Sequence, residues 1–386
     1  MPKIRIREID KTDNQGLASN DNVIFLVDNA YDNTTNKLVL IEDETKIPSA
    51  LDETNTSFIK KVIELGGKVI VAKSYDTAKD YLKDRNQFDV KFLLATEQAA
   101  AKVEGSSTDQ KAAKSASDTS AAEAATTDLA KAVEIATARR DCVVVYTKNS
   151  AAYVDNKDKA TVEGNFTESD DKFAEDPNAN GKYVLSFYAK NLTVNNESLE
   201  AGKAYILAYL NSIKTNPEWL AIAGSKRGLI PGDQDKITVG FMSESDIDGM
   251  QTDGKSAAIN PIVEMNPWGV RIWGNRTAYK SDKGLTASSF ANIRILLCDL
   301  KKRLYKAARK YQFEQNSDVL WVNFQAEVNS LLEEMVHSYG IAGYRWFREE
   351  TKDRAKIAAR LQIIPVEAVE DFDLTIELTD SLTVNE

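Results

Sequence analysis

The sequence predicts a mixed α/β (α+β) protein, and two patterns lead to that prediction. Between residues 22 and 95, short apolar runs alternate with amphipathic stretches of helical period. Such alternation is typical of a partly parallel sheet with helices packed against it. After residue 287 the pattern changes to two long amphipathic helices, followed by stretches in which apolar and polar residues alternate. We therefore expect an α/β part and a second part that combines a β-sheet with two long helices.

The elements of the first part follow from local composition. Gly66 and Gly67 follow an amphipathic helix instead of opening one, so we interpret them as its C-cap and not as a phosphate-binding loop. The apolar runs between the helices have the length of buried strands. The expected elements are a strand at 23–27, a helix at 56–65, a strand at 69–72, a helix at 76–85 and a strand at 88–95.

A segment rich in Ala, Ser, Thr and Lys comes next. It has almost no large apolar side chain before Leu129, so it buries too little surface to join a core. We expect an exposed insertion at about 99–128. The composition then predicts a helix at 128–138, a buried strand at 142–146, a helix at 201–210 and a further segment at 221–228 that completes this part.

The first long helix, at 290–311, has apolar side chains at three- and four-residue steps. Ser288 or Ser289 is its expected N-cap. Seven cations surround the apolar stripe: Arg294, Lys301, Lys302, Arg303, Lys306, Arg309 and Lys310. They form either a solvated face or a face that binds an acidic partner.

The second long helix repeats the apolar spacing from Leu320 to Met335. Ser317 or Asp318 is the expected cap and Gly340 the expected stop. A stretch of alternation at 354–364 follows and ends at Pro365.

Both ends of the chain have the pattern of a strand. Residues 3–9 alternate apolar and charged side chains, and residues 371–378 alternate strictly. Terminal strands usually fold into their own sheet, but a polar link also lets a strand join the sheet of a neighbouring chain. The apolar residues concerned are Ile4, Ile6 and Ile9 at one end and Phe372, Leu374, Ile376 and Leu378 at the other.

Composition argues against several classes of function. The net charge of −10 is unsuited to general phosphate binding, so we expect no direct nucleic-acid contact. No apolar run approaches the roughly 20 residues that span a bilayer, so we expect no membrane insertion. Cys142 and Cys298 lack the spacing of zinc or redox motifs and are interpreted as buried small hydrophobes.

Catalytic patterns are almost absent. The single histidine, His337, has no Ser or Cys motif with it and is expected at a helix end. Asp246, Asp248 and Asp253 lack the spacing of a calcium loop and favour a polar turn. We therefore expect no catalytic site, no metal and no cofactor, and a soluble α/β enzyme is the least favoured alternative.

The most specific feature lies between residues 260 and 277, where two glycines bracket a short strand. This segment resembles the Asn-Pro-Ile, then Gly-x-x-x-Trp-Gly-x-Arg-Thr signature of contractile tail sheath proteins from bacteriophages and phage-like particles. Weaker similarities at 139–145, 187–189, 221–228, 313–321 and 340–344 follow in the family's order. The signature residues are Asn260, Pro261, Trp268, Gly269, Trp273, Gly274, Arg276 and Thr277.

The resemblance implies the structural subunit of a contractile phage tail sheath. Such subunits form a helical polymer of hexameric rings around the tail tube and contract to drive the tube through the host envelope. The implied partners are further copies of the chain, the tail tube protein, and baseplate and tail terminator proteins. The implied location is the virion tail, assembled in the host bacterial cytoplasm. The alternative is a sheath subunit of a pyocin-like particle or another bacterial contractile injection system.

The resemblance also implies a division of the chain. It gives an N-terminal donor-strand arm and linker at 1–21, an outer α/β domain at 22–255, an inner domain at 256–370 and a C-terminal donor-strand arm at 371–386. The arms would add strands to sheets of adjacent subunits. If the seven cations bind an acidic partner instead of solvent, we expect the basic helix to face inward, toward a tail tube with acidic patches.

Overall fold

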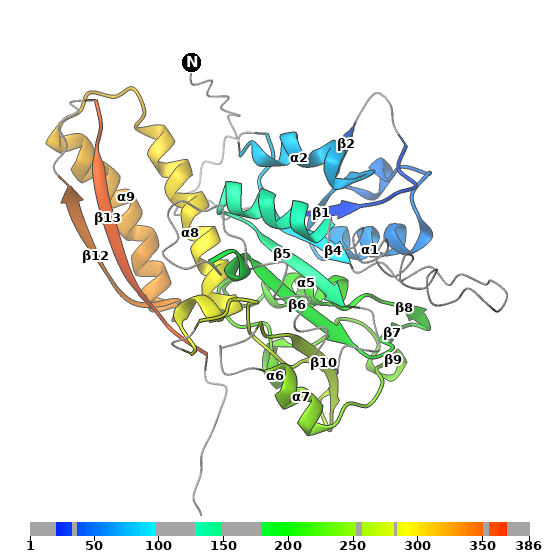
Figure 1. Cartoon of the computed structure of the whole chain (residues 1–386). Coiled ribbons are helices and arrows are strands. Elements are labelled where there is room, and N and C mark those ends of the chain that lie inside the picture. The colour runs from blue at the N-terminus through cyan, green and yellow to red at the C-terminus, as the bar shows by residue number, and fades with distance from the viewer. Residues whose placement is uncertain are drawn as a thin grey trace, which may run out of the picture.

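A computed structural model describes residues 21–32, 37–85, 87–96, 128–148, 179–251, 257–281, 284–349 and 355–368. Its main feature is an eight-stranded sheet in the order β11-β10-β6-β5-β4-β1-β3-β2. A unit of two long helices and a β-hairpin lies to one side of it (Figure 1). The strands of the large sheet are β1 (Val23–Val27), β2 (Leu38–Ile41), β3 (Lys68–Ala72), β4 (Val90–Thr96), β5 (Val143–Lys148), β6 (Val184–Ala189), β10 (Asn260–Met265) and β11 (Gly269–Ile272).

The large sheet is mostly parallel. Its five inner pairs of strands are parallel, and the outermost pairs, β2 with β3 and β10 with β11, are antiparallel. The expected α/β class and partly parallel sheet are therefore confirmed. The helices associated with this part are α1 (Glu53–Glu64), α2 (Tyr75–Lys83), a helix at 128–139, α5 (Ala201–Ser212), α6 (Gly224–Arg227) and α7 (Glu244–Met250).

The two faces of the sheet have separate cores because side chains alternate along each strand. Ile24 and Leu26 of β1 belong to the core that includes α1 and α5. Val23 and Phe25 belong to the core that includes α2 and the helix at 128–139. Gly66 has φ +85, and the N–H of Gly67 donates to the carbonyl of Val62 at 2.8 Å, which confirms the expected C-cap of α1.

Smaller elements complete this part. The Asp246 region is a short helix, α7, with a capping box between Ser243 and Asp246, and not the polar turn that we expected. The remaining elements are β7 (Thr193–Val194), β8 (Glu197–Ser198) and β9 (Ile237–Thr238), which form a three-stranded sheet, and the single-turn helices η1 (Glu44–Lys46), η3 (Ala179–Tyr183), η4 (Gln234–Lys236) and η5 (Ala287–Ser289).

The signature segment forms a hairpin, β10–β11, that belongs to the large sheet. β10 pairs in parallel with β6, with Asn260 opposite Phe187. Residues 260–263 are buried, so the hairpin continues the core of the sheet instead of beginning a new one. The expected division between residues 255 and 256 therefore separates segments that share one sheet, and the domain boundaries themselves stay a prediction.

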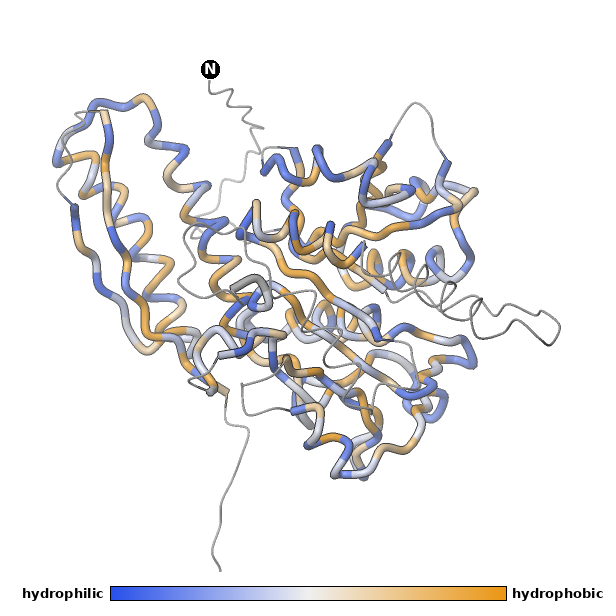
Figure 2. Tube along the Cα trace, viewed as in Figure 1, coloured by the Kyte–Doolittle hydropathy of each residue, from blue (hydrophilic) through white to orange (hydrophobic). Residues whose placement is uncertain are grey.

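The second part contains α8 (Ala291–Lys310), α9 (Asp318–His337), β12 (Ile341–Glu349) and β13 (Ala358–Pro365). Its core joins α8, α9 and the inner face of the β12–β13 hairpin. Helix α8 belongs to two cores, because Ile295 and Cys298 pack with the large sheet while Leu296 and Leu300 pack with α9. In Figure 2, apolar residues follow the central strands of the large sheet and continue along α9.

The helix ends partly match the expectations. Ser317 caps α9 by accepting from the N–H of Leu320, as expected. Neither Ser288 nor Ser289 caps α8; its N-cap is Phe290, without a side-chain hydrogen bond. The reason is that the preceding turn, η5, has its own capping box in which Ser289 pairs with Thr286.

The predicted arm residues Ile4, Ile6, Ile9, Phe372, Leu374, Ile376 and Leu378 lie outside the described residues, as does the predicted insertion apart from its last residue. None of the helices in the described ranges combines the length and apolar composition needed to cross a membrane.

Candidate functional site

Asn260 is the centre of the signature. Its side chain is fully buried at the start of β10. The amide nitrogen donates to the carbonyls of Ser186 at 3.0 Å and Arg276 at 2.8 Å, and the amide oxygen accepts from the N–H of Arg276 at 2.7 Å. Asn260 thus holds β6, β10 and the segment after β11 together.

Gly274 is required by the same contacts. A β-carbon on Gly274 would lie 2.7 Å from the side-chain oxygen of Asn260 and 2.9 Å from its α-carbon. Real β-carbons do not approach other atoms so closely, and backbone cannot move aside easily. The N–H of Trp273 donates to the carbonyl of Pro261 at 2.8 Å, which fixes the approach of the two segments.

Arg276 and Thr277 attach the hairpin to the start of α8. The guanidinium of Arg276 lies 4.9 Å from the ring centroid of Phe290, the N-cap of α8. The hydroxyl of Thr277 donates to the carbonyl of Ser288 at 2.8 Å, and its N–H donates to the carbonyl of Ser289 at 2.9 Å. These two signature residues therefore set where α8 begins.

Sequence reasoning missed a second pair at this junction. The side-chain nitrogen of Asn275 donates to the side-chain oxygen of Asn292 at 2.8 Å, and the N–H of Asn292 donates back to Asn275 at 3.2 Å. Both side chains are buried. Asn275 lies inside the signature and was visible as a polar residue next to a strand, but its partner in α8 had no signal in the sequence.

Trp268 and Gly269 lie at the turn between β10 and β11. Gly269 has φ +79, a conformation that favours glycine. Trp268 is 48% exposed, unlike Asn260, Pro261, Arg276 and Thr277, which are buried. Most of the signature is therefore a packed junction between the large sheet and α8, with Trp268 as its main exposed side chain.

Replacing Asn260 by Leu is expected to destabilise the chain by about 3 kcal/mol, because three buried backbone groups lose their hydrogen-bond partner. Trp268→Ala, at the exposed end of the same hairpin, is the matched control and is expected to cost less than about 1 kcal/mol. Urea unfolding followed by circular dichroism measures both. Equal losses in the two variants would contradict the central role of Asn260.

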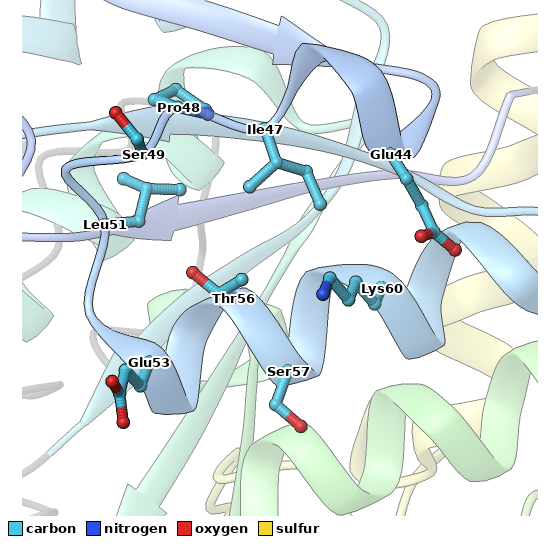
Figure 3. Close-up of a pocket in the computed structure, with 9 residues that line it drawn as sticks. All are labelled: Glu44, Ile47, Pro48, Ser49, Leu51, Glu53, Thr56, Ser57 and Lys60. Atoms are coloured by element: carbon cyan, nitrogen blue, oxygen red, sulfur yellow. The ribbon is translucent and has the colours of Figure 1, made fainter.

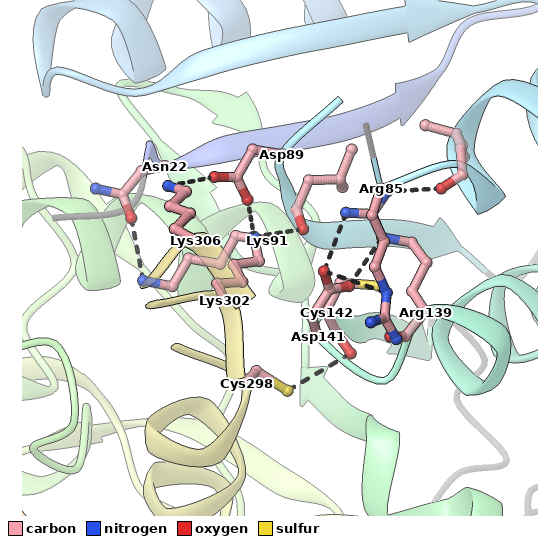
Figure 4. A network of polar contacts seen from close by, with 12 residues as sticks. Asn22, Arg85, Asp89, Lys91, Arg139, Asp141, Cys142, Cys298, Lys302 and Lys306 are labelled. Carbon is pink, nitrogen blue, oxygen red and sulfur yellow. Dashed lines mark hydrogen bonds and ion pairs between the residues drawn. The ribbon is translucent and has the colours of Figure 1, made fainter. Parts of the chain in front are cut away.

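The seven cations of the basic helix do not form one outward face. Arg294, Lys302 and Arg303 are buried. The ammonium of Lys302 lies 2.5 Å from a carboxylate oxygen of Asp89 and donates to the carbonyl of Val90 at 2.8 Å. Lys306 reaches the other oxygen of Asp89 at 2.9 Å (Figure 4). Our expectation of a solvated or partner-binding face is therefore wrong for the buried cations, because α8 packs against the ends of β4 and β5.

The other cations of α8 have different surroundings. Lys301 is exposed and donates to the carbonyl of Arg140 at 3.2 Å. The guanidinium of Arg309 lies 5.1 Å from the ring of Tyr305. Lys310 is exposed and pairs with Glu327 of α9. An outward basic surface of α8 is thus limited to its last turns and Lys301.

Further charged residues lie where α8 packs against the ends of β4 and β5. Lys91 of β4 pairs with Glu218 at 2.5 Å. Arg139 pairs with Asp141 at 2.9 Å (Figure 4). The thiol of Cys298 approaches the carbonyl of Cys142 at 3.8 Å. Both cysteines are free and buried, as expected, but the fold brings them to the same contact between α8 and β5.

The pKa of Asp89 reports on these ion pairs. Burial raises the pKa, but the charges of Lys302 and Lys306 outweigh burial and lower it from 3.8 to about 2. A lowered pKa in the folded state stabilises the fold above the unfolded pKa, and the stabilisation is lost as the pH falls through the folded pKa. The difference corresponds to about 2 kcal/mol, lost between roughly pH 4 and pH 2.

We therefore expect the chain and its Asp89→Asn variant to differ in unfolding free energy at pH 7 and to converge only as the pH falls to about 2. The reason is that protonated Asp89 no longer holds the two lysines. Unfolding by urea at a series of pH values measures the difference. A gap that stays constant from pH 7 to pH 2 would show that Asp89 does not stabilise the fold through its charge.

We searched the described residues for a depression, a metal-ligand group or a histidine arranged as in an enzyme site. The depression beside α1, between Glu44, Pro48 and Lys60, is open and mixed in character (Figure 3). No group of three or more His, Cys, Asp or Glu side chains in the described ranges is arranged to hold a metal ion. His337 lies in the last turn of α9, as expected.

Comparisons with known proteins find similarity to sheath proteins. No protein-family model matches the chain. A curated protein named tail sheath protein, from Vibrio phage KVP40, is 25% identical over 245 residues, which cover 60% of this chain and 32% of that protein. The chain thus spans about a third of the length of this relative.

Two solved structures match almost the whole chain. One is from the contracted sheath complex of PVC, an extracellular contractile injection system, with a TM-score of 0.64, 15% identity and 98% of both chains covered. The other is from the contracted helical sheath of the anti-feeding prophage, with a TM-score of 0.59, 13% identity, 97% of this chain and 98% of that chain covered. These comparisons confirm the resemblance to contractile sheath proteins, and the chain has their fold.

Proposed function

We propose that this chain, which has the fold of contractile sheath proteins, is the structural subunit of a contractile bacteriophage tail sheath. The subunit polymerises around the tail tube and contracts to drive the tube through the host envelope, so that the genome is delivered. The observation that carries the proposal is the match of 245 residues to a phage tail sheath protein. It is supported by a shared fold across almost the entire chain.

Self-association is supported by the β12–β13 hairpin. In the described residues these two strands pair only with each other. One face of the hairpin packs on α9 through Tyr344, Trp346, Leu361 and Ile363. Two-stranded sheets are marginal in water, and open strand edges attract further strands. We propose that the terminal strands at 3–9 and 371–378 of neighbouring subunits complete this sheet.

The apolar row of the C-terminal strand suits this role. Phe372, Leu374, Ile376 and Leu378 share one face of an extended strand because side chains alternate. Added beside the hairpin, that face would continue the apolar surface that contacts α9. The other proposed partners are the tail tube, the baseplate and the tail terminator, in a particle assembled in the bacterial cytoplasm and located in the virion tail.

Contact with the tube involves fewer cations than the sequence indicates. Lys302 and Arg303 are buried within the chain, so direct contact falls to exposed residues of α8 such as Lys301 and Lys310. Exposed ion pairs contribute roughly 0.2 to 1 kcal/mol each, which suits a surface that holds the tube and then releases it. The role proposed for the chain is structural, without catalysis.

A pyocin-like particle or another contractile injection system is the second candidate. The two solved structures with this fold come from such systems, which favours this candidate. The phage relative favours a virion. Capsid genes beside the gene for this chain would indicate a phage tail, and their absence from an otherwise complete tail cluster would indicate an injection particle.

The proposed function is tested by expressing the full chain with and without its tail tube protein and examining the products by negative-stain electron microscopy. The expected result is helical sheaths that form around tubes, or contracted tubular polymers of the chain alone. A chain that stays monomeric at high concentration in both cases would contradict the proposed function.

A further inference from the structure

Trp219 connects the large sheet to the second part of the chain. It lies in the segment after α5, and its side chain is only 4% exposed. Trp219 and Leu220 belong to the core formed by α8, α9 and the β12–β13 hairpin, whereas the other described members of that core come from α8 or later elements. An indole from the first part of the chain is thus enclosed by the second part.

The segment that carries Trp219 is fixed to the large sheet. The carboxylate of Glu218 pairs with the ammonium of Lys91 on β4 at 2.5 Å, and both side chains are largely buried. On the other side, Ile222 belongs to the core that the large sheet forms with α1 and α5. Because the residues that flank Trp219 are anchored in this way, the indole keeps a fixed place relative to the large sheet.

The indole contacts the second part where α9 ends and the hairpin begins. Its N–H donates to the carbonyl of Ser338 at 3.4 Å. A β-carbon on Gly340 would lie 2.7 Å from two indole atoms, Cδ1 and Nε1. The N–H of Gly340 donates to the carbonyl of Met335 at 2.8 Å, and its carbonyl accepts from the N–H of Val366 at 3.2 Å. Trp219 therefore touches the point that joins α9 to both ends of the hairpin.

The contact with the indole, and not the backbone conformation, explains the glycine at 340. The φ angle of Gly340 is not positive, so an alanine could adopt the same backbone. Its methyl group would lie closer to the indole than the ordinary contact distance of about 3.5 Å. Gly340 thus allows a close approach between the two parts of the chain.

Helix α8 alone does not fix the orientation of the second part. Ile295 and Cys298 hold α8 to the large sheet, and Lys302 pairs with Asp89. These contacts all lie along one helix, and contacts along one line do not resist rotation about that line. The contact between the indole and the backbone after α9 lies beside α8, and it resists this rotation.

We infer that Trp219 fixes the orientation of the second part relative to the large sheet, and thereby the helical twist of the polymer. The statement about twist rests on the proposed function, in which copies of the chain form a helical polymer. Such a polymer repeats one contact between copies, so a change in the shape of the subunit is repeated at every step. A small rotation between the two parts of each chain therefore changes the twist.

The orientation is measured in the full-length chain by double electron–electron resonance between two spin labels. The labels are attached at Lys60→Cys on α1 and Ala359→Cys on β13, both exposed positions. These two elements lie on opposite sides of the molecule (Figure 1). The native cysteines are buried and therefore protected from labelling. Labelled chain is diluted into unlabelled chain of the same variant, so that only distances within one chain are recorded.

Trp219→Ala is expected to broaden the distance distribution and to displace its mean by about 3 to 4 Å, the thickness of the ring that is removed. Trp219→Phe keeps a ring against Gly340 and should retain a mean near that of the unmodified chain. Val328→Ala is the matched control, because Val328 is buried in the same core but lies in the middle of α9. Its distribution should be unchanged.

An unchanged distribution in Trp219→Ala would overturn the inference. An equal displacement in Val328→Ala would also overturn it, because any loss of core volume would then move the second part. Gly340→Ala provides a second measurement that does not require removal of the indole. Its methyl group should displace the mean in a chain that retains Trp219, and an unchanged mean in this variant would contradict the inference.

The twist is measured by electron cryo-microscopy of polymers assembled from the unlabelled variants. Trp219→Ala polymers are expected to have a different twist or a spread of twists, whereas Val328→Ala polymers should keep the twist of the unmodified chain. The same twist in all three polymers would overturn the link between Trp219 and polymer geometry. Absence of polymers from the unmodified chain would contradict the proposed function, and the distance measurement would still decide whether Trp219 fixes the orientation.

Discussion

Removal of residues 371–386 is expected to give a folded monomer that no longer forms sheath polymers. An added strand contributes about four to six backbone hydrogen bonds at roughly 1 kcal/mol each, together with the burial of its apolar row. The truncation removes the C-terminal strand from every subunit, so every contact that this strand makes between subunits is lost. We therefore expect the concentration needed for polymerisation to rise more than a thousandfold, above concentrations that can be prepared. Size-exclusion chromatography and negative-stain microscopy measure assembly, and circular dichroism measures folding.

Single substitutions test the apolar row and the polar row of the C-terminal strand separately. Leu374→Asp places a charge in the apolar row and is expected to abolish assembly, whereas Thr375→Asp, in the polar row, is the matched control and should assemble. Tubes of normal appearance from the truncated chain would contradict strand donation by this end. Equal assembly by the two substituted chains would contradict the assignment of the apolar row.

The second large effect is expected at Lys302. Lys302→Glu places a carboxylate beside the buried carboxylate of Asp89, and we expect a loss of about 3 to 5 kcal/mol in unfolding free energy. Lys302→Met removes the charge but keeps most of the apolar length, and Lys306 still pairs with Asp89. Its expected cost is therefore smaller. Urea unfolding at pH 7 measures both variants.

Arg309→Glu is the matched control on the same helix. Its side chain is partly exposed and contacts the ring of Tyr305, without an acid partner in the described residues. We expect a change below about 0.5 kcal/mol. Equal unfolding free energies for Lys302→Glu and Arg309→Glu would contradict a stabilising buried ion pair at Lys302. They would favour the solvated face that the sequence suggests.

The sequence by itself predicted most of the helices but only part of the strands. The apolar run at 23–27, the glycine pair after α1 and the stripe of the second long helix each produced the expected element. These patterns are local, because the period of side chains along a helix or strand depends on residues a few positions apart. β2, β6 and β12 were missed, and β10 was not expected as a separate strand of the large sheet.

The signature also indicated the resemblance to contractile sheath proteins before its geometry was known. The resemblance identified Asn260, Gly274 and Arg276 as signature residues, but it gave no reason for these residue types. The structure supplies the reason: Asn260 satisfies three backbone groups from two distant segments, and Gly274 leaves room for it. The terminal strands lie outside the described residues, so their pairing remains a prediction.

Only the tertiary structure decided which charges are exposed. In the sequence, Lys302 looks like Lys301, since both lie on one basic helix with few acids nearby. In the fold, α8 is shared by two cores, and Lys302 turns toward Asp89, a residue more than two hundred positions earlier in the chain. A charge is buried only where a distant segment provides its partner, and long-range chain packing, which no local pattern encodes, determines that encounter.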